Sequence, residues 1–223
     1  MKNIVVIAPH PDDETLGCGG TLLKLKQLGS RIHWVIGTRM TEEDGFSAER
    51  IASREKEIEG VAAAFGFDSV HQLNLPTTRL DSLEFKNIVG HISSLFSEIR
   101  PDLVFVQNRS DIHSDHRILF EAVMSCCKWF RYPSIKKIMM YEVPSETDAI
   151  PALPESVFMP NSFSDISGYI DKKVDIMKNY YSSEFGQHPF PRSEMTMRSL
   201  AAYRGAQCGV EFAEAFMNLK EMW

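Results

Sequence analysis

The amino-acid sequence predicts an α/β fold of one doubly wound sheet, mostly parallel, with helices on both of its faces. Short apolar runs rich in β-branched residues alternate along the chain with longer segments of helical periodicity. Strands that alternate with helices form parallel sheets through right-handed crossovers. The 223 residues suffice for one well-buried domain, and no Gly/Ser-rich or Pro-rich linker divides them, so we expect residues 1–223 to form a single domain.

The first strand is expected almost at the N-terminus, and a helix follows it. Residues 3–8 read Asn-Ile-Val-Val-Ile-Ala, a composition typical of a parallel strand that is buried on both faces. Pro11 suits a first helical turn, and leucines then recur at helical spacing, which predicts a helix over about residues 15–28. Residues 31–36 form the second expected strand, and a polar loop follows over residues 37–45.

The next two helices are amphipathic and have recognisable ends. Residues 47–65 combine charge pairs with an apolar repeat, and Gly66 ends this helix. Residues 70–75 are the third expected strand. Residues 81–99 place large apolar side chains on one helical face, and Pro101 marks the end of that helix.

The fourth expected strand is the short buried run at residues 103–106. A polar loop at residues 107–116 follows it and leads into a helix over about residues 117–129. Beyond this point the pattern is weaker. It indicates two further strands, at residues 135–141 and 157–159, and two further helices, at residues 165–180 and 195–207.

Two polar motifs follow the first and the fourth strand. Pro-His-Pro-Asp-Asp-Glu occupies residues 9–14, and His-Ser-Asp-His occupies residues 113–116. In the common strand order 3-2-1-4-5, strands one and four are neighbours, and their carboxyl ends flank the switch point where such sheets bind ligands. The fold therefore brings the two motifs together. By itself, the first motif is equally compatible with a turn and a helix N-cap, because Asp and Pro favour such positions.

Together the motifs contain the donors of a catalytic metal site. Zinc binds nitrogen, sulfur and carboxylate ligands, and a catalytic site uses three protein ligands and leaves a fourth position for water. His10, Asp13 and His116 supply such a set. A hydrolase also needs a base and a group that stabilises an oxyanion. The polar side chains that remain for these tasks are Asp12, His113 and Asp115.

The paired motifs resemble those of the LmbE/PIG-L family of zinc-dependent N-deacetylases. The resemblance extends in order and spacing from about residue 2 to residue 117, with a weaker match toward the C-terminus. It implies a Rossmann-like fold and the removal of an acyl group, usually acetyl, from an amino sugar such as an N-acetylglucosamine derivative. It also implies that His10, Asp13 and His116 bind one zinc ion per chain, although iron or cobalt can occupy a similar ligand set.

The resemblance implies catalytic and substrate-binding roles as well. Asp12 would be the general base, and His113 the protonated histidine that stabilises the oxyanion. Asp115 would orient His113 or stabilise its charge. An arginine on the second helix contacts substrate in the family; Arg54 is the match here, with Arg50 one turn earlier as the alternative.

Three further segments have open roles. Arg79 follows the third strand and can bind a substrate phosphate or hydroxyl, although a solvated loop arginine explains it equally well. The family pattern His-x-Ser-Gln is replaced by Tyr-Ser-Ser-Glu at residues 181–184, which leaves substrate contacts there open. Residues 186–192 contain His188 and two prolines and form a candidate lid, although a lone loop histidine is usually a surface residue.

The glycine run and the four cysteines are expected to have structural roles. The run Gly-Cys-Gly-Gly at residues 17–20 lacks the spacing of a dinucleotide fingerprint and predicts close packing of the helix against the sheet. The four cysteines form no CxxC pair and are expected to be buried thiols in a reducing compartment.

Composition limits the partners. The net charge of −6 and the pI near 5.7 argue against a nucleic-acid partner. No apolar stretch reaches the length of a membrane span, and the N-terminus lacks the features of a signal peptide. We therefore expect a soluble, cytoplasmic protein, and a homo-oligomer is possible.

The expected function is that of a zinc-dependent hydrolase that removes an N-acyl group from a small-molecule amino sugar or glycoconjugate. One alternative is a metal-dependent hydrolase of another bond, such as a phosphoester, although such sites usually use a second metal or several cationic residues. The other is a sugar-binding protein that retains zinc without turnover. The sugar, the aglycone and the acyl group stay open at this stage.

Overall fold

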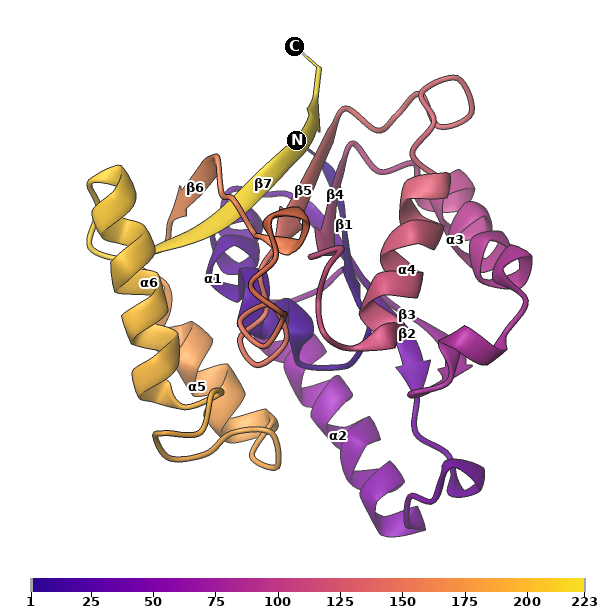
Figure 1. The fold of residues 1–223 in the computed structure, drawn as a ribbon, viewed down its shortest axis with the longest axis horizontal. Helices are drawn as coiled ribbons and strands as arrows, with labels where there is room; N and C mark the ends of the chain where they lie inside the picture. The colour runs from indigo at the N-terminus through magenta and orange to yellow at the C-terminus, as the bar shows by residue number, and fades with distance from the viewer. Residues whose placement is uncertain (1, 223) are drawn as a thin grey trace.

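The computed structural model describes residues 2–222 and confirms the α/β fold (Figure 1). Within these residues, one sheet has seven strands in the order β3-β2-β1-β4-β5-β7-β6. The strands are β1 (Asn3–Ala8), β2 (Arg31–Arg39), β3 (Ser69–Pro76), β4 (Leu103–Gln107), β5 (Lys137–Tyr141), β6 (Ser162–Asp165) and β7 (Ala213–Glu221). The first five are parallel, and β7 runs antiparallel to both β5 and β6.

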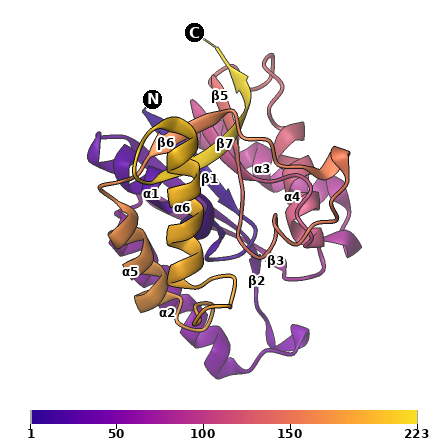
Figure 2. The same ribbon diagram turned by 60° about the vertical axis from the view of Figure 1, so that its left-hand side comes forward.

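Helices cover both faces of the sheet. They are α1 (Asp13–Gln27), α2 (Ala48–Phe65), α3 (Phe85–Ile99), α4 (Ser114–Ser125), α5 (Ile170–Tyr180) and α6 (Glu194–Cys208). Apolar side chains of α1, α2, α5 and α6 share one core with one face of the sheet, and those of α3 and α4 share a second core with the opposite face. Figure 2 shows α5 and α6 lying in front of the sheet on the first of these faces.

The predicted order of the first five strands is confirmed. β1 lies between β2 and β4, with Val5 paired to His33 on one side and to Val104 on the other. The helix that follows β1 and the helix that follows β4 therefore cover opposite faces. The carboxyl ends of β1 and β4 flank the switch point, where the loops diverge and leave room for a ligand.

The boundaries of several predicted elements differ from the structure, and those of α1, α4 and β2 affect the site; elsewhere α3 and α5 begin four and five residues later than predicted. α1 begins at Asp13 and α4 at Ser114, so Asp13 and His116 lie in first helical turns and not in loops. β2 continues through Arg39, because its last residues still pair with the end of β3. The predicted loop at residues 37–45 is therefore shorter.

The C-terminal third contains the two errors in strand assignment. No strand forms at residues 157–159, where Val157 and Met159 are exposed; the strand in this region is β6, at Ser162–Asp165. The last strand, β7, was not predicted. It inserts between β5 and β6, and this pairing across the sheet stabilises a segment whose own sequence does not alternate cleanly.

A break in α1 lies just beyond the first turns of this helix. Cys18 has non-helical angles (φ −141°, ψ 17°). Glu214 of β7 accepts hydrogen bonds from the main-chain N–H groups of Gly20 (2.9 Å) and Thr21 (2.7 Å). Lys173 donates to Glu214 (2.7 Å) and to a main-chain carbonyl before the break (2.9 Å). The backbone groups that the break frees are thus bonded in the core, as burial requires.

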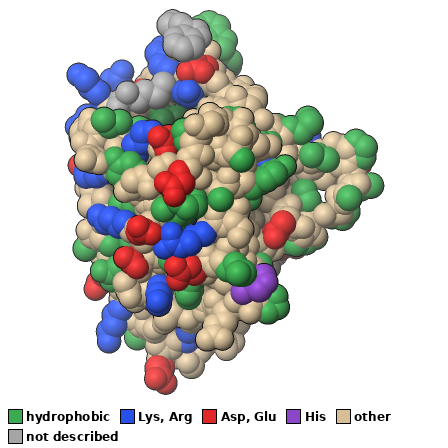
Figure 3. Space-filling view, turned by 90° about the vertical axis from the view of Figure 1, so that its left-hand side faces the viewer, with side chains coloured by type: hydrophobic (Ala, Val, Ile, Leu, Met, Phe, Trp, Pro, Cys, Tyr) green, Lys and Arg blue, Asp and Glu red, His purple; other side chains and the backbone are tan. Residues whose placement is uncertain are grey.

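Charged side chains of both signs lie on the surface (Figure 3), and the cysteine thiols are unpaired. Figure 3 shows the face formed by α5 and α6, on which basic and acidic side chains are interspersed. Among the described residues, no helix is both long enough and apolar enough to cross a membrane. All four cysteines are free; three are buried, but Cys208 is exposed, so the prediction of four buried thiols was wrong for that residue.

The predicted close packing of the glycine run against the sheet is confirmed at Gly17, whereas Gly19 and Gly20 pack on helices and on Ile166. A Cβ at Gly17 would lie 2.1 Å from the ring of Tyr141, whose hydroxyl donates to Ile7 O (2.6 Å) and anchors the ring. Gly17→Ala should therefore destabilise the fold by about 1–3 kcal/mol, the usual cost of overpacking. Thermal and urea unfolding measure this. Gly90→Ala is the control, because nothing lies within 4 Å of a Cβ there and alanine favours the helix; equal destabilisation by both changes would contradict the packing argument.

Candidate active site

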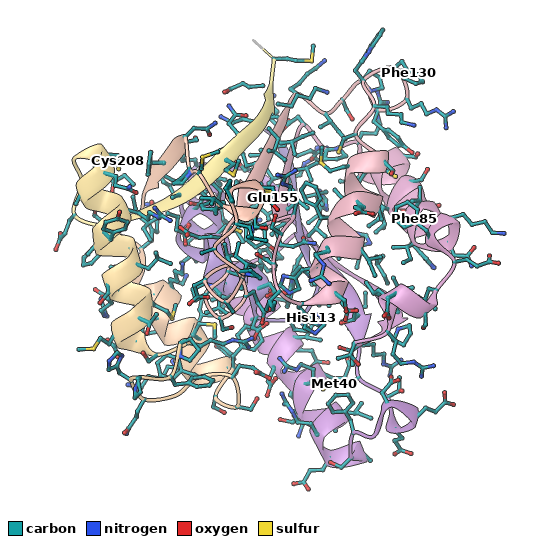
Figure 4. The ribbon with its side chains drawn as sticks, in the orientation of Figure 1. Met40, Phe85, His113, Phe130, Glu155 and Cys208 are labelled. Atoms are coloured by element: carbon teal, nitrogen blue, oxygen red, sulfur yellow. The ribbon has the colours of Figure 1, made fainter. Side chains whose placement is uncertain are left out.

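The two sequence motifs meet at the carboxyl ends of β1 and β4, as predicted. His10 lies two residues after the end of β1, and Asp13 lies in the first turn of α1. His113 is the N-cap of α4, and His116 lies in the first turn of the same helix. Figure 4 places His113 at this end of the sheet, near the start of α4.

Three donor atoms form a nearly regular triangle. His116 Nε2 lies 3.3 Å from Asp13 Oδ2 and 3.4 Å from His10 Nδ1, and His10 Nδ1 lies 3.7 Å from Asp13 Oδ2. Tetrahedral zinc with bonds of about 2.0–2.2 Å requires its ligand atoms to be about 3.3–3.6 Å apart. The residues present therefore fit a divalent metal, and the fit involves the ligand set that the resemblance implies.

Each histidine of this triangle is oriented by a buried carboxylate. The Nε2–H group of His10 donates to Asp115 Oδ2 (3.1 Å), and the Nδ1–H group of His116 donates to Asp111 Oδ2 (2.9 Å). With the protons assigned in this way, His10 Nδ1 and His116 Nε2 carry no hydrogen, and their lone pairs can coordinate a metal. Asp111 was missed by the sequence analysis, although it lies in the predicted polar loop after β4.

The electrostatics of the cluster suit a cation. Burial acts to lower the pKa of His116, but the carboxylates of Asp13 and Asp111 outweigh it and raise this pKa to about 10. Burial acts to raise the pKa of Asp13, but His116 and His10 hold it well below the usual range. Two buried carboxylates around one imidazole thus favour positive charge at this point, which a divalent ion supplies.

Asp12 lies beside the triangle with its side chain held apart from the helix. It occupies the N-cap position of α1 with φ 136°, a conformation that costs a non-glycine residue free energy, and its carboxylate makes no capping bond. Instead, Asp12 Oδ2 accepts from Arg192 (2.6 Å), and the main-chain N–H of Asp12 donates to Glu14 (3.2 Å). Burial raises the pKa of Asp12 to about 7 although Arg192 opposes this. A carboxylate of that pKa suits a general base.

His113 lines the same pocket, in surroundings that favour a different protonation state from the one expected. Its Nδ1 accepts a hydrogen bond from the main-chain N–H of Asp115 (3.1 Å), which leaves the proton of the neutral ring on Nε2. Burial, together with the neighbouring His10, lowers the pKa of His113 to about 4. The surroundings thus favour a neutral imidazole that donates a hydrogen bond through Nε2–H, whereas the resemblance implies a protonated histidine.

Asp115 also contacts a different partner from the one expected. Its Oδ2 accepts from His10 and from the main-chain N–H of Thr78 (2.7 Å), whereas it lies 3.9 Å from His113 Nδ1. The carboxylate of Asp115 therefore orients His10, a member of the donor triangle. Asp115 contacts His113 through its main-chain N–H group.

A pocket opens next to the cluster, between the start of α2 and the segment around Arg192. Arg54 lines it and is nearly buried, whereas Arg50 does not line it. Arg79 lies on the exposed rim, with a side chain that is 56% exposed and paired with Asp44 (3.1 Å), outside the pocket lining. His188 is exposed and also lies outside this pocket. The polar residues that line the pocket include Asp12, His113, Arg54, Glu146, Glu184 and Arg192.

Asp111 gives a prediction that separates orientation from ligation. Its other carboxylate oxygen accepts from Asn108 (2.9 Å) and Thr147 (2.6 Å), so the carboxylate is fixed in place. Asp111→Asn should reduce metal affinity by about 10–100-fold, the usual cost of losing an outer partner of a ligating histidine. Competitive chelator titration measures this. The matched control is Asp102→Asn, at a carboxylate that lies near the opposite end of β4; unchanged affinity in Asp111→Asn would contradict the role of Asp111.

Comparison with known proteins identifies a family and relatives of this chain. The sequence model of the PIG-L family, described as GlcNAc-PI de-N-acetylase, matches residues 5–127. An uncharacterized deacetylase of Escherichia coli, YaiS, is 28% identical over 187 residues, covering 81% of this chain and 91% of that protein. The diacetylchitobiose deacetylase of Thermococcus kodakarensis is 25% identical over 230 residues, covering 96% of this chain and 82% of that protein.

A solved structure matches over the whole fold. The conserved protein TT1542 of Thermus thermophilus superposes with a TM-score of 0.78 at 25% identity, covering 100% of this chain and 97% of that one. The family model and these deacetylase relatives, together with the matching fold, define the class of this chain as an amide-hydrolysing enzyme, a deacetylase. Since the family match extends over more than half of its residues, the chain belongs to the PIG-L family.

Proposed function

We propose that this enzyme is a zinc-dependent deacetylase that removes the acetyl group from an N-acetylated amino sugar or its conjugate. The observation that carries the proposal is the triangle formed by His10 Nδ1, Asp13 Oδ2 and His116 Nε2, placed beside a buried Asp12 in a pocket. The named activity of the Thermococcus relative, on diacetylchitobiose, supports the substrate class.

In this mechanism His10, Asp13 and His116 hold the metal. A divalent ion bound there polarises the amide carbonyl and makes a water more acidic. Asp12 takes the proton from the water that attacks the carbonyl carbon, since this carboxylate is next to the metal ligand Asp13 in the chain and burial raises its pKa to about 7. Arg192 holds Asp12 in its position, with an N–O distance of 2.6 Å.

His113 stabilises the developing oxyanion with its Nε2–H group, which its Nδ1 bond to the backbone leaves available. The tetrahedral carbon then loses its nitrogen substituent. The leaving nitrogen needs one proton, and the proton that Asp12 accepted from water meets this need. The products are acetate and the free amine of the sugar, and Asp12 returns to its ionised state.

A sugar suits the remaining walls of the pocket. Thr38, Gln72 and Thr77 line it together with charged side chains, which offers both donors and acceptors to hydroxyl groups. Arg54 is the proposed substrate contact on α2; its guanidinium also donates to Pro11 O (2.8 Å), next to Asp12. We keep Arg79 as a candidate for contacting an extended aglycone at the rim.

The experiment is a screen for release of acetate and of free amine from N-acetylglucosamine, N,N'-diacetylchitobiose and N-acetylated nucleotide sugars. Each is tested with zinc-loaded protein, with protein treated with a chelator, and after restoring zinc. Zinc-dependent release of both products in equal amounts supports the proposal. Release of phosphate from p-nitrophenyl phosphate without amine release would favour a phosphoesterase, and sugar binding without turnover would favour a non-catalytic protein.

A further inference from the structure

Glu184 is surrounded by three guanidinium groups. Its Oε1 accepts from Arg50 (3.0 Å) and from Arg54, and its Oε2 accepts from Arg192 (3.1 Å). These arginines come from α2 and from the segment before α6, so Glu184 joins two walls of the pocket. This carboxylate stands at the position where the resemblance leads one to expect a glutamine.

The other cations of the pocket are likewise paired with carboxylates of the chain. Arg39 lies 3.7 Å from Glu55, and both residues line the pocket. Arg192 contacts Asp12 and lies 3.4 Å from Glu146 in addition to Glu184. The pocket therefore contains three arginines and, in Asp12, Glu55, Glu146 and Glu184, four carboxylates. Each arginine among the described residues that line the pocket therefore already has a carboxylate partner.

We propose that Glu184 is a specificity-determining residue that occupies the place of a substrate anion and so makes the enzyme select uncharged glycosides over those carrying a phosphate or a carboxylate near the sugar. This inference rests on the proposed deacetylase function.

The physical argument is one of competition. An anionic group can use Arg54 or Arg192 only if it approaches Glu184, and like charges repel strongly in a site from which water is partly excluded. It must also break charge-assisted bonds that the guanidinium groups already make to Glu184 and Asp12. Uncharged hydroxyl groups avoid this repulsion and can donate to carboxylate oxygens of the pocket. Selection against anions is thus a repulsive element built into the binding site.

The test compares two substrate pairs in the zinc-loaded enzyme and in Glu184→Gln. N-acetylglucosamine and N,N'-diacetylchitobiose are the uncharged probes, and the 1-phosphate and 6-phosphate of N-acetylglucosamine are the anionic ones. Glu184→Gln keeps the size of the side chain and removes its charge. The ratio of kcat/KM for an anionic probe to that for an uncharged probe should rise about tenfold or more.

Glu57→Gln is the matched control. Glu57 is ion-paired with Arg50 (2.9 Å) and Arg54 (3.2 Å), two of the same arginines, but it does not line the pocket. Its substitution should leave the ratio within about twofold, because no anion position inside the pocket is vacated. An unchanged ratio in Glu184→Gln, or an equal rise in Glu57→Gln, would overturn the proposal.

A binding measurement separates this inference from the proposed function. Calorimetry with glucosamine 6-phosphate and glucosamine, which carry no acyl group, needs no turnover. Glu184→Gln should increase the affinity for glucosamine 6-phosphate about tenfold more than the affinity for glucosamine. Equal changes in the two affinities would overturn the inference. If no N-acetyl sugar is hydrolysed by the wild type, the proposed function fails, and the binding comparison still decides the role of Glu184.

Discussion

Replacing His116 by Ala is expected to abolish tight binding of a divalent metal by this protein. His116 is completely buried, and its Nε2 is the atom of the donor triangle that lies nearest to both other donors. Its loss leaves two protein ligands where a catalytic site needs three. The affinity should fall by more than the roughly 10–100-fold that the loss of an outer partner such as Asp111 costs. Asp13→Ala should act in the same direction.

Metal content after dialysis and competitive chelator titration measure this effect. His91→Ala is the control, because His91 is an exposed histidine on α3 and belongs to no cluster near the pocket. Circular dichroism checks that the His116 variant folds, and His116→Gln, which loses less volume, serves if it does not. Full metal stoichiometry and wild-type affinity in His116→Ala would remove His116 from the ligand set.

The sequence predicted the central sheet well because its signals are local. The strands β1, β4 and β5 are short and largely apolar, and the helix α2 has clear caps, Ser47 at its start and Gly66 at its end. Parallel topology then brings the ends of β1 and β4 together without further information. This is why two motifs about a hundred residues apart could be combined into one cluster before its geometry was known.

The C-terminal strands could not be predicted because their stability comes from pairing and not from their own composition. β6 reads Ser-Phe-Ser-Asp and lies at an edge, where one neighbour, β7, supplies its hydrogen bonds. β7 contains Glu214 near its start, a buried charge that a strand rarely accommodates; here it binds Lys173 and the main-chain N–H groups after the break in α1. The apolar run at residues 157–159 was the stronger local signal and was misleading.

The outer partners of the site were missed for a similar reason. Arg192 contacts Asp12 from 180 positions along the chain. Its only local signal was a conspicuous loop with two prolines, in which His188 attracted attention instead. Asp111 orients His116, and Asp115 orients His10. Which histidine nitrogen each carboxylate reaches depends on side-chain directions, which are set by packing in the folded protein. Motif spacing therefore identifies candidate metal ligands more readily than the residues that orient them.

Asp12→Asn should produce the second large effect, on turnover and not on metal binding. Asp12 contributes no atom to the donor triangle, so metal content should stay that of the wild type. Loss of the base should lower kcat by about 100-fold or more, the usual scale for removing general-base catalysis. KM should change little, because the substitution keeps the shape of the side chain and the proton transfer belongs to the transition state.

Stability separates a catalytic role of Asp12 from a structural one. Burial opposes ionisation of Asp12 and raises its pKa, so the buried charge costs free energy that the asparagine does not. Arg192 retains Glu184 and Glu146 as partners in the variant, which limits the loss from the broken ion pair. We therefore expect at most a small change in the free energy of unfolding together with a large loss of turnover. Unchanged turnover would exclude Asp12 as the base, whereas loss of the metal would show that Asp12 and Asp13 have exchanged the roles assigned to them.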